Sequence, residues 1–207
     1  MVPIVVEGGC LTQRTIDLKC PGCGGPVTSS DSTCKYCGRP VIISSFNSVY
    51  SMSMPELNKY ASAYKQALAG NPSHAGLNNS LAMCYLKLKL HKQALAAFEK
   101  AMEDNLDNSE TYFYAAICLL EAKKAFLTTR SVIEKIEQYI NAALMIEPRG
   151  IYYYFQAYIK YDYFSRKFFQ TSPTYQEALQ MARSNGVSQF DIEQFYGVLG
   201  VSRPEAL

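Results

Sequence analysis

Four of the seven cysteines have a spacing that could bind a metal ion. They form two C-x-x-C pairs, Cys20 with Cys23 and Cys34 with Cys37, and ten residues separate the pairs. Each pair continues as C-x-x-C-G-x-P-V, so the same local sequence occurs twice. A gap of two residues lets both thiolates of a pair face one ion, and the glycine permits the positive φ of a tight turn. The spacing therefore predicts two matching turns that close a tetrahedral site of four thiolates.

Other chemistries of paired cysteines suit this chain less well. Disulfides need an oxidising compartment, and residues 1–9 lack the basic start and long apolar run of a secretory signal. A thioredoxin-like redox motif needs a strand and a helix around one pair, a context that two closely spaced copies do not fit. An iron or iron–sulfur site would use the same four ligands, so the spacing alone leaves zinc and iron open. We expect zinc.

The segment over 16–43 resembles the zinc ribbon family. That resemblance implies one structural zinc ion (Zn²⁺) bound by Cys20, Cys23, Cys34 and Cys37, with no coordination position left open for catalysis. It also implies that the ion stabilises a fold too small to have a sufficient core of its own. Zinc ribbons also contact proteins and nucleic acids. Lys35 and Arg39 flank the second pair, but residues 1–45 hold only four basic and three acidic side chains.

The remaining residues with chemical potential form no catalytic pattern. Cys84 and Cys118 fall on apolar helical faces and are expected to be buried. We assign no role to Cys10. The two histidines, His74 and His91, lie in or near turns between predicted helices. The sequence contains no H-E-x-x-H, G-x-x-x-x-G-K-[ST] or G-x-S-x-G motif. We therefore expect neither an enzymatic activity nor a small-molecule substrate.

The elements that must position these residues fall into three parts. Residues 1–45 are predicted to form an N-terminal segment and the ribbon, 46–54 a serine-rich linker, and 55–207 a helical domain with capping helices at its C-terminal end. Strand signals disappear in the third part, and turns rich in Gly, Pro and Asn separate helical stretches. The predicted helices cover 56–69, 75–88, 91–104, 109–124, 131–147, 151–168, 173–185 and 189–199.

Alanines and large apolar residues recur over 75–108 with the spacing of a helix pair. They read Leu81-Ala82-x-x-Tyr85 and then Ala94-x-x-x-Phe98-x-x-Ala101. This 34-residue unit resembles the tetratricopeptide repeat, although Asn78 and Leu106 replace the family's Trp and Pro. A second unit over 109–148 matches with an insertion at 123–131, and the resemblance fades towards 183. It implies a mainly α fold, in which a tetratricopeptide-like solenoid of antiparallel helix pairs follows the small β zinc ribbon.

The resemblance also implies a non-enzymatic cytosolic adaptor or scaffold that binds a protein or peptide partner, with the ribbon as a second contact module. In such solenoids the first helix of each pair lines a groove. Because this face is apolar here, we expect an apolar or amphipathic partner segment. The alternative is a nucleic-acid-associated factor, in which the ribbon contacts phosphate and the helices recruit protein. The expected groove residues are Asn79, Met83, Leu86, Lys87, Phe113, Ile117, Leu120 and Phe155.

Composition sets broader limits. Hydrophobic residues make up 48% of the 207 residues and charged residues 18%, which excludes global disorder. The net charge of +2 produces no overall field that would attract nucleic acid. No stretch approaches the roughly 20 apolar residues of a membrane helix, so we expect a cytoplasmic protein without a membrane partner. Residues 152–169 hold ten aromatic side chains, more than one helix face can bury. Three roles stay open for this segment: part of the core, a cap on the end of the helical stack, or a contact surface.

Overall fold

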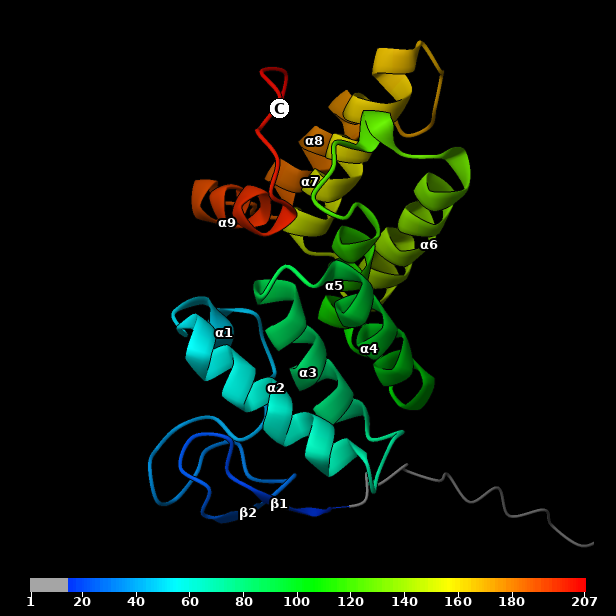
Figure 1. The fold of residues 1–207 in the computed structure, drawn as a ribbon. Helices are drawn as coiled ribbons and strands as arrows, with labels where there is room; N and C mark the ends of the chain where they lie inside the picture. The colour runs from blue at the N-terminus through cyan, green and yellow to red at the C-terminus, as the bar shows by residue number, and fades with distance from the viewer. Residues whose placement is uncertain (1–14) are drawn as a thin grey trace, which may run out of the picture.

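The computed structural model describes residues 15–207, so Cys10 and residues 1–9 lie outside the described part of the chain. The described chain is mainly helical and has a two-stranded sheet near its N-terminal end. In Figure 1 the sheet lies at one end of the molecule, helices α2 to α8 follow towards the other end, and α9 returns to the middle. The predicted combination of a mainly α fold with a small β segment is therefore confirmed. None of the helices within residues 15–207 has the length and apolar content that a bilayer crossing requires.

The sheet consists of two short antiparallel strands. Strand β1 (Asp17–Lys19) pairs with β2 (Pro26–Thr28), and Leu18 stands opposite Val27. An isolated bridge between Thr33 and Pro40 repeats this hairpin geometry in the second half of the segment. Val27 is buried together with Val41, Cys20 and Cys34 in a cluster of its own. This cluster is small, so the segment has little apolar core of its own.

The helical part consists of successive helices joined by short turns, and each predicted helix has a counterpart. Helices pack as the consecutive pairs α3 with α4, α5 with α6 and α7 with α8, while α2 packs on α3 and α4 on α5. Ala82, Ala94 and Ala101 are all buried, as expected for small residues where helices cross. The helices are α2 (Met54–Leu68), α3 (Ala75–Lys87), α4 (His91–Asp104), α5 (Ser109–Leu119), α6 (Arg130–Ile146), α7 (Gly150–Ile159), α8 (Tyr175–Ser184) and α9 (Gln189–Leu199).

Two helices end earlier than predicted. Helix α5 stops at Leu119 because Glu121 and Ala122 adopt positive φ angles of 47° and 57°, which a right-handed helix does not allow. The insertion predicted after it contains a 3₁₀ helix, η1 (Ala125–Leu127). Helix α7 gives way to a π-helical turn, η2 (Lys160–Phe164), and a 3₁₀ turn, η3 (Ser165–Lys167).

The segment predicted as a linker over 46–54 is part of the packed structure. It contains a short helix, α1 (Asn47–Tyr50), and both Phe46 and Val49 are buried. The ring of Phe46 lies 5.2 Å from that of Tyr114 on α5, and α1 also packs on α3. The serine-rich segment is therefore not a free connection, because its two apolar side chains, Phe46 and Val49, pack among the helices.

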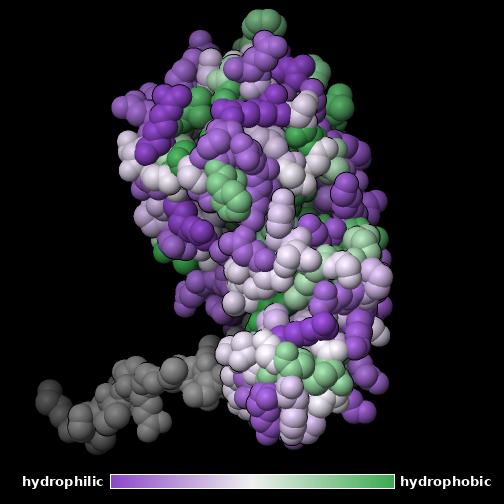
Figure 2. Space-filling view, turned by 90° about the vertical axis from the view of Figure 1, so that its left-hand side faces the viewer, coloured by the Kyte–Doolittle hydropathy of each residue, from purple (hydrophilic) through white to green (hydrophobic). Residues whose placement is uncertain are grey.

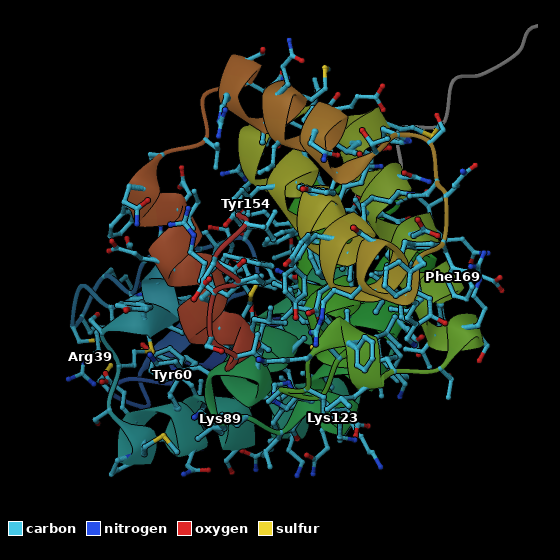
Figure 3. The ribbon with its side chains drawn as sticks, turned by 90° about the horizontal axis from the view of Figure 1, so that it is seen from above. Arg39, Tyr60, Lys89, Lys123, Tyr154 and Phe169 are labelled. Carbon is cyan, nitrogen blue, oxygen red and sulfur yellow. The ribbon has the colours of Figure 1, made fainter. Side chains whose placement is uncertain are left out.

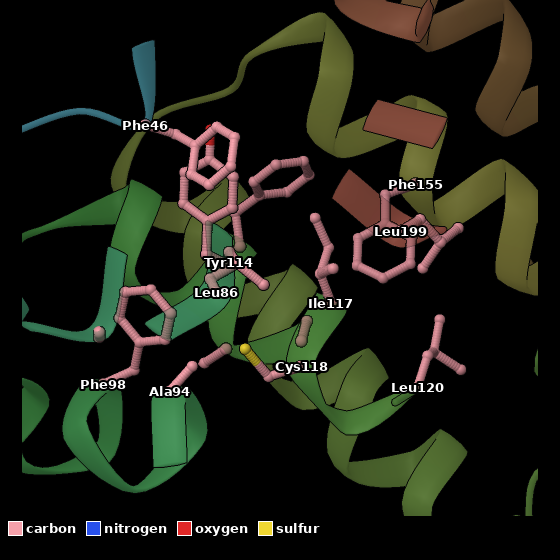
Figure 4. Close-up of a cluster of buried hydrophobic side chains, with 14 of the residues drawn as sticks. Phe46, Leu86, Ala94, Phe98, Tyr114, Ile117, Cys118, Leu120, Phe155 and Leu199 are labelled. Atoms are coloured by element: carbon pink, nitrogen blue, oxygen red, sulfur yellow. The ribbon is translucent and has the colours of Figure 1, made fainter. Parts of the chain in front are cut away.

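The C-terminal helix α9 packs back onto the middle of the molecule. Ser188 caps its first turn in a capping box with Asp191. The ring of Phe195 lies 5.0 Å from that of Phe155 and 6.2 Å from that of Phe113. Figure 4 shows Leu199 of α9 in the same cluster as Phe155. Helix α9 is thus part of the core and does not merely cap one end.

Most of the aromatic segment over 152–169 is buried. The side chains that enter the core are Tyr152, Tyr154, Phe155, Tyr158, Tyr163 and Phe164. Tyr153 and Tyr161 are partly buried, whereas Phe168 and Phe169, which follow η3, are exposed. The segment is therefore core over most of its length and surface at its end.

Candidate metal centre

Two turns with the same hydrogen bonds position the four cysteines. The N–H of Gly24 donates to the carbonyl of Cys20, and the N–H of Gly38 donates to the carbonyl of Cys34, each over 2.8 Å. Gly24 and Gly38 have φ angles of 80° and 70°, so the positive φ predicted after the second cysteine of each pair is confirmed. The repeated C-x-x-C-G sequence thus forms two equivalent turns, which present their sulfurs to each other.

The four sulfurs have the separations of ligands around one ion. Every pair of these atoms lies within 4.8 Å, and the Cys20–Cys37 and Cys23–Cys34 pairs are each 3.7 Å apart. A disulfide needs about 2.05 Å between sulfurs, so these cysteines are not paired with each other. Four metal–sulfur bonds of about 2.3 Å in a tetrahedron would place the sulfurs about 3.8 Å apart. The residues therefore fit a tetrahedral metal ion, and the four predicted ligands are brought together.

The backbone around the sulfurs favours the thiolate form. Burial acts to raise the pKa of the Cys34 thiol, but N–H groups of Tyr36 and Cys37 face its sulfur and lower the pKa to about 7. For Cys37, the N–H of Arg39 acts to lower the pKa, whereas burial and the neighbouring sulfurs raise it to about 11. Crowded thiols that ionise one after another show such opposite shifts. A cation between them would stabilise all four thiolates.

The site is half-buried. Cys20 and Cys34, the first cysteine of each pair, are buried, whereas Cys23 and Cys37 are exposed. Four sulfurs would complete a tetrahedral coordination shell, so an ion held here has no position left for water or a substrate. The arrangement is that of a structural site. Its geometry alone does not separate zinc from iron, since both accept four thiolates.

Helix α2 contacts the metal-binding segment directly. Lys59 Nζ donates a 2.6 Å hydrogen bond to the carbonyl of Gly22, inside the first cysteine turn. The hydroxyls of Tyr60 and Tyr64 donate to the carbonyls of Pro40 and Val41 over 3.1 Å and 2.8 Å. Both tyrosines are fully buried, and burial raises the pKa of each. The sequence gives no local signal for these contacts, because the two tyrosines bond to residues 20 and 23 positions away.

The side chains expected to line an open groove are mostly interior. Asn79 accepts a hydrogen bond from Thr111 within the core, and Lys87 Nζ lies 4.3 Å from the centre of the Tyr50 ring. Helices α1 and α9 occupy this face, with Phe46 and Phe195 inserted among its aromatic rings. A partner could reach the face only by displacing them. The buried members are Asn79, Met83, Leu86, Phe113, Ile117, Leu120 and Phe155.

The other two cysteines with described positions are buried as predicted. Cys84 and Cys118 lie in the helical core, and burial raises the pKa of Cys84 to about 12. Burial raises the pKa of Cys118 as well. Both thiols therefore remain protonated and act as small apolar side chains.

No protein-family model matches this chain, and no curated protein matches its sequence.

Proposed function

We propose that this protein is a non-enzymatic adaptor that binds a protein partner, with a tetratricopeptide-like stack of helix pairs joined to a structural zinc ribbon. The stack is supported by the consecutive helix pairs and by buried alanines at their crossings. The ribbon is supported by its two equivalent cysteine turns and a closed set of four thiolates. Zinc is the ion that such closed tetrathiolate sites most often hold in proteins without redox function.

The observation that supports partner binding best is a groove of about 390 Å³ between α2, α3 and α4. Its floor is mainly apolar, and two lysines, Lys65 and Lys100, belong to its lining, which includes no acidic side chain. Ala69 and Ala96 are exposed there, so the floor is shallow and open. We expect the partner to present apolar anchors at helical spacing, with carboxylates beside them to meet the lysines. The lining residues are Lys65, Leu68, Ala69, Pro72, Asn78, Leu81, Tyr85, Gln93, Ala96, Ala97 and Lys100.

Substitution in the groove tests this proposal. Ala96→Arg would fill the groove and place a third positive charge in it without touching the core, because Ala96 is exposed. Gln180→Arg on α8 adds the same side chain at an exposed position elsewhere and is the matched control. A partner that binds the wild type and Gln180→Arg but not Ala96→Arg would support the groove. A purified partner that binds all three chains equally would exclude it.

The cysteine segment presents a second surface for a partner, smaller than the groove between α2, α3 and α4. The Tyr36 side chain is 59% exposed, and Lys35 Nζ lies 5.2 Å from the centre of its ring. Two other cations near the cysteines are already engaged, since Arg39 pairs with Glu56 at 3.2 Å and Lys59 donates to Gly22. Few free cations are thus left for phosphate, and the nucleic-acid alternative has less support than a protein contact. Binding of DNA or RNA that falls steeply with salt would reverse this order.

A further inference from the structure

Two loops at the end of the molecule opposite the sheet place large apolar side chains in solvent. We call residues 123–130 and 165–170 the tip, and η1 packs on η2 where the two loops meet. Leu127 is 71% exposed, Phe168 95% and Phe169 50%. Figure 3 looks down on this end and labels Phe169 and Lys123. Figure 2 shows a hydrophobic side chain protruding at the same end. The tip therefore exposes large apolar groups from both loops, and Phe168 and Phe169 also line a hollow of about 430 Å³ beside the start of α8.

The same two loops carry positive charge only. Their five charged residues are all basic. Three of these cations pair with carboxylates of neighbouring elements: Lys123 with Glu121, Arg130 with Glu134 and Arg166 with Asp162. Within residues 15–207, Lys124 and Lys167 form no ion pair. Positive charge thus remains available around the apolar side chains.

A buried carboxylate holds the two loops together. The side chain of Asp162 is only 2% exposed. Its Oδ2 accepts a 3.0 Å hydrogen bond from the N–H of Phe126 in the first loop, and its Oδ1 accepts a 2.7 Å bond from Arg166 in the second. Arg166 and Lys167 both lie over the ring of Phe126. The tip is thus a preformed surface, and its loops need not be ordered when they bind.

Phe168 combines two features that are locally unfavourable. Its backbone is left-handed, with φ 60° and ψ 25°, a conformation that suits glycine and is rarely adopted by bulky residues. Its ring is also almost fully exposed to water. The packing of residues 15–207 does not account for a phenylalanine at this 95% exposed position, whereas a contact outside the chain would.

We propose that the tip docks on the surface of a lipid bilayer that contains anionic phospholipids. Phe168, Phe169 and Leu127 enter the boundary between headgroups and acyl chains, and the flanking cations contact headgroup phosphates. Exposed apolar side chains with cations around them match the interface of an anionic bilayer, where acyl chains and phosphate groups lie side by side. The sequence predicted no membrane partner because it has no spanning segment, but a peripheral contact needs none.

Stacking on single-stranded nucleic acid fits the same residues less well. Base stacking needs free aromatic faces with cations beside them. Here Lys167 lies 3.8 Å from the centre of the Tyr163 ring, and the Phe126 ring lies under both Arg166 and Lys167. These faces are covered by the chain's own cations. The exposed rings that remain are those of Phe168 and Phe169, and Leu127, the exposed side chain of the other loop, offers no ring on which a base could stack.

Vesicle binding by the full chain tests the proposal. Vesicles of phosphatidylcholine alone are compared with vesicles of phosphatidylcholine and phosphatidylglycerol in a sedimentation assay. We expect binding to the mixed vesicles only, weakened by salt, with a loss of about fivefold for each of Lys124→Gln and Lys167→Gln. Lys19→Gln, at an exposed lysine of β1 near the other end of the molecule, is the control and should bind as the wild type does. Absence of binding to the mixed vesicles would overturn the proposal.

Apolar variants complete the experiment. Phe168→Gly removes the ring and suits the left-handed backbone, so it should leave the melting temperature unchanged or higher. Combined with Phe169→Ser, it should weaken vesicle binding by more than about tenfold. Phe190→Ser, at a 66% exposed position on α9, should have no effect. Unchanged vesicle binding by the double variant would overturn the proposal. An equal loss of vesicle binding in the Phe190→Ser control would overturn it as well.

Discussion

The hydroxyl of Tyr64 donates a 2.8 Å hydrogen bond to the backbone carbonyl of Val41, and this bond joins α2 to the cysteine segment. Both residues are fully buried. No other hydrogen bond to this carbonyl occurs within residues 15–207. The metal-binding segment and the helical part are therefore packed into one structure, and the stability of each depends on the other.

Tyr64→Phe should destabilise the protein without changing its metal content. The substitution removes only the hydroxyl and leaves the buried Val41 carbonyl without a donor, at a cost of about 1–2 kcal/mol. Denaturant unfolding measures this change, and elemental analysis measures the metal. Tyr60→Phe is the comparison, because its 3.1 Å bond to Pro40 is only partly buried and should cost less. Equal stability of wild type and Tyr64→Phe would show that the bond does not join the two parts.

Metal removal should weaken the helical part as well as the cysteine segment. We expect about one zinc ion per chain, and Cys34→Ser should lose it because three thiolates bind more weakly than four. Chelation should then lower the thermal midpoint of the helical signal in circular dichroism, since Tyr60 and Tyr64 lose ordered acceptors. Cys118→Ala, outside the site, should keep its zinc. A metal-free chain with an unchanged midpoint would contradict the coupling.

Ala94→Phe should overpack the crossing of α3 and α4. Ala94 is fully buried, so the larger ring has no space and should cost about 1–3 kcal/mol. Ala96→Phe places the same ring two residues away on the exposed side of the same helix and should change stability by less than about 0.5 kcal/mol. Urea unfolding of both variants measures the difference. Similar values for the two would mean that α4 does not face α3 in this register.

Phe195→Ala should show that α9 is part of the core. Phe195 is 2% exposed and contacts aromatic rings of α5 and α7, so its loss should cost about 3–5 kcal/mol. Phe190→Ala on the same helix is the control, because Phe190 is 66% exposed. Thermal unfolding compares the two. If Phe195→Ala melts like the control, α9 leaves this face readily and the groove expected from the sequence becomes accessible.

Acid should destabilise the protein partly through His91. Both ring nitrogens are buried without a hydrogen-bond partner among the described residues. Desolvation lowers the pKa of His91; Glu121 acts to raise it and Lys89 to lower it. The unfolded chain therefore binds the proton more readily than the folded chain. His91 leaves the free energy of unfolding unchanged above the ordinary histidine pKa of about 6.5 and lowers it as the pH falls below that value.

The test compares melting temperatures of the wild type and His91→Gln at about pH 7.5 and about pH 5.5, on either side of that pKa. The wild type should lose more stability between these values than the variant does. Acid also protonates the cysteine ligands in both chains, so only the difference between the two reports on His91. An identical pH dependence would exclude a role for this side chain.

The cysteine turns and the helix ranges could be predicted from the sequence because both follow from local rules. A C-x-x-C-G segment needs only its own residues to place two sulfurs and to turn at Gly24 or Gly38. Helical periodicity and turn residues likewise set where α2–α9 begin and end to within a few residues, with two exceptions. Positive φ at Glu121 ended α5 early, and the π-helical turn η2 ended α7 early. The burial of Ala94 and Ala101 followed from the same periodicity.

Only the tertiary structure decided which faces remain open. Periodicity shows that the face containing Phe113 is apolar, but it does not show that Phe195, more than eighty residues later, covers it. In the same way, Asp162 looks like an exposed acid in the sequence and is instead a buried link between two loops. Such contacts depend on how far apart the helices and loops lie. Many weak packing interactions along the whole chain together set those distances. No short segment encodes them, so the buried and exposed apolar surfaces could be told apart only in the folded molecule.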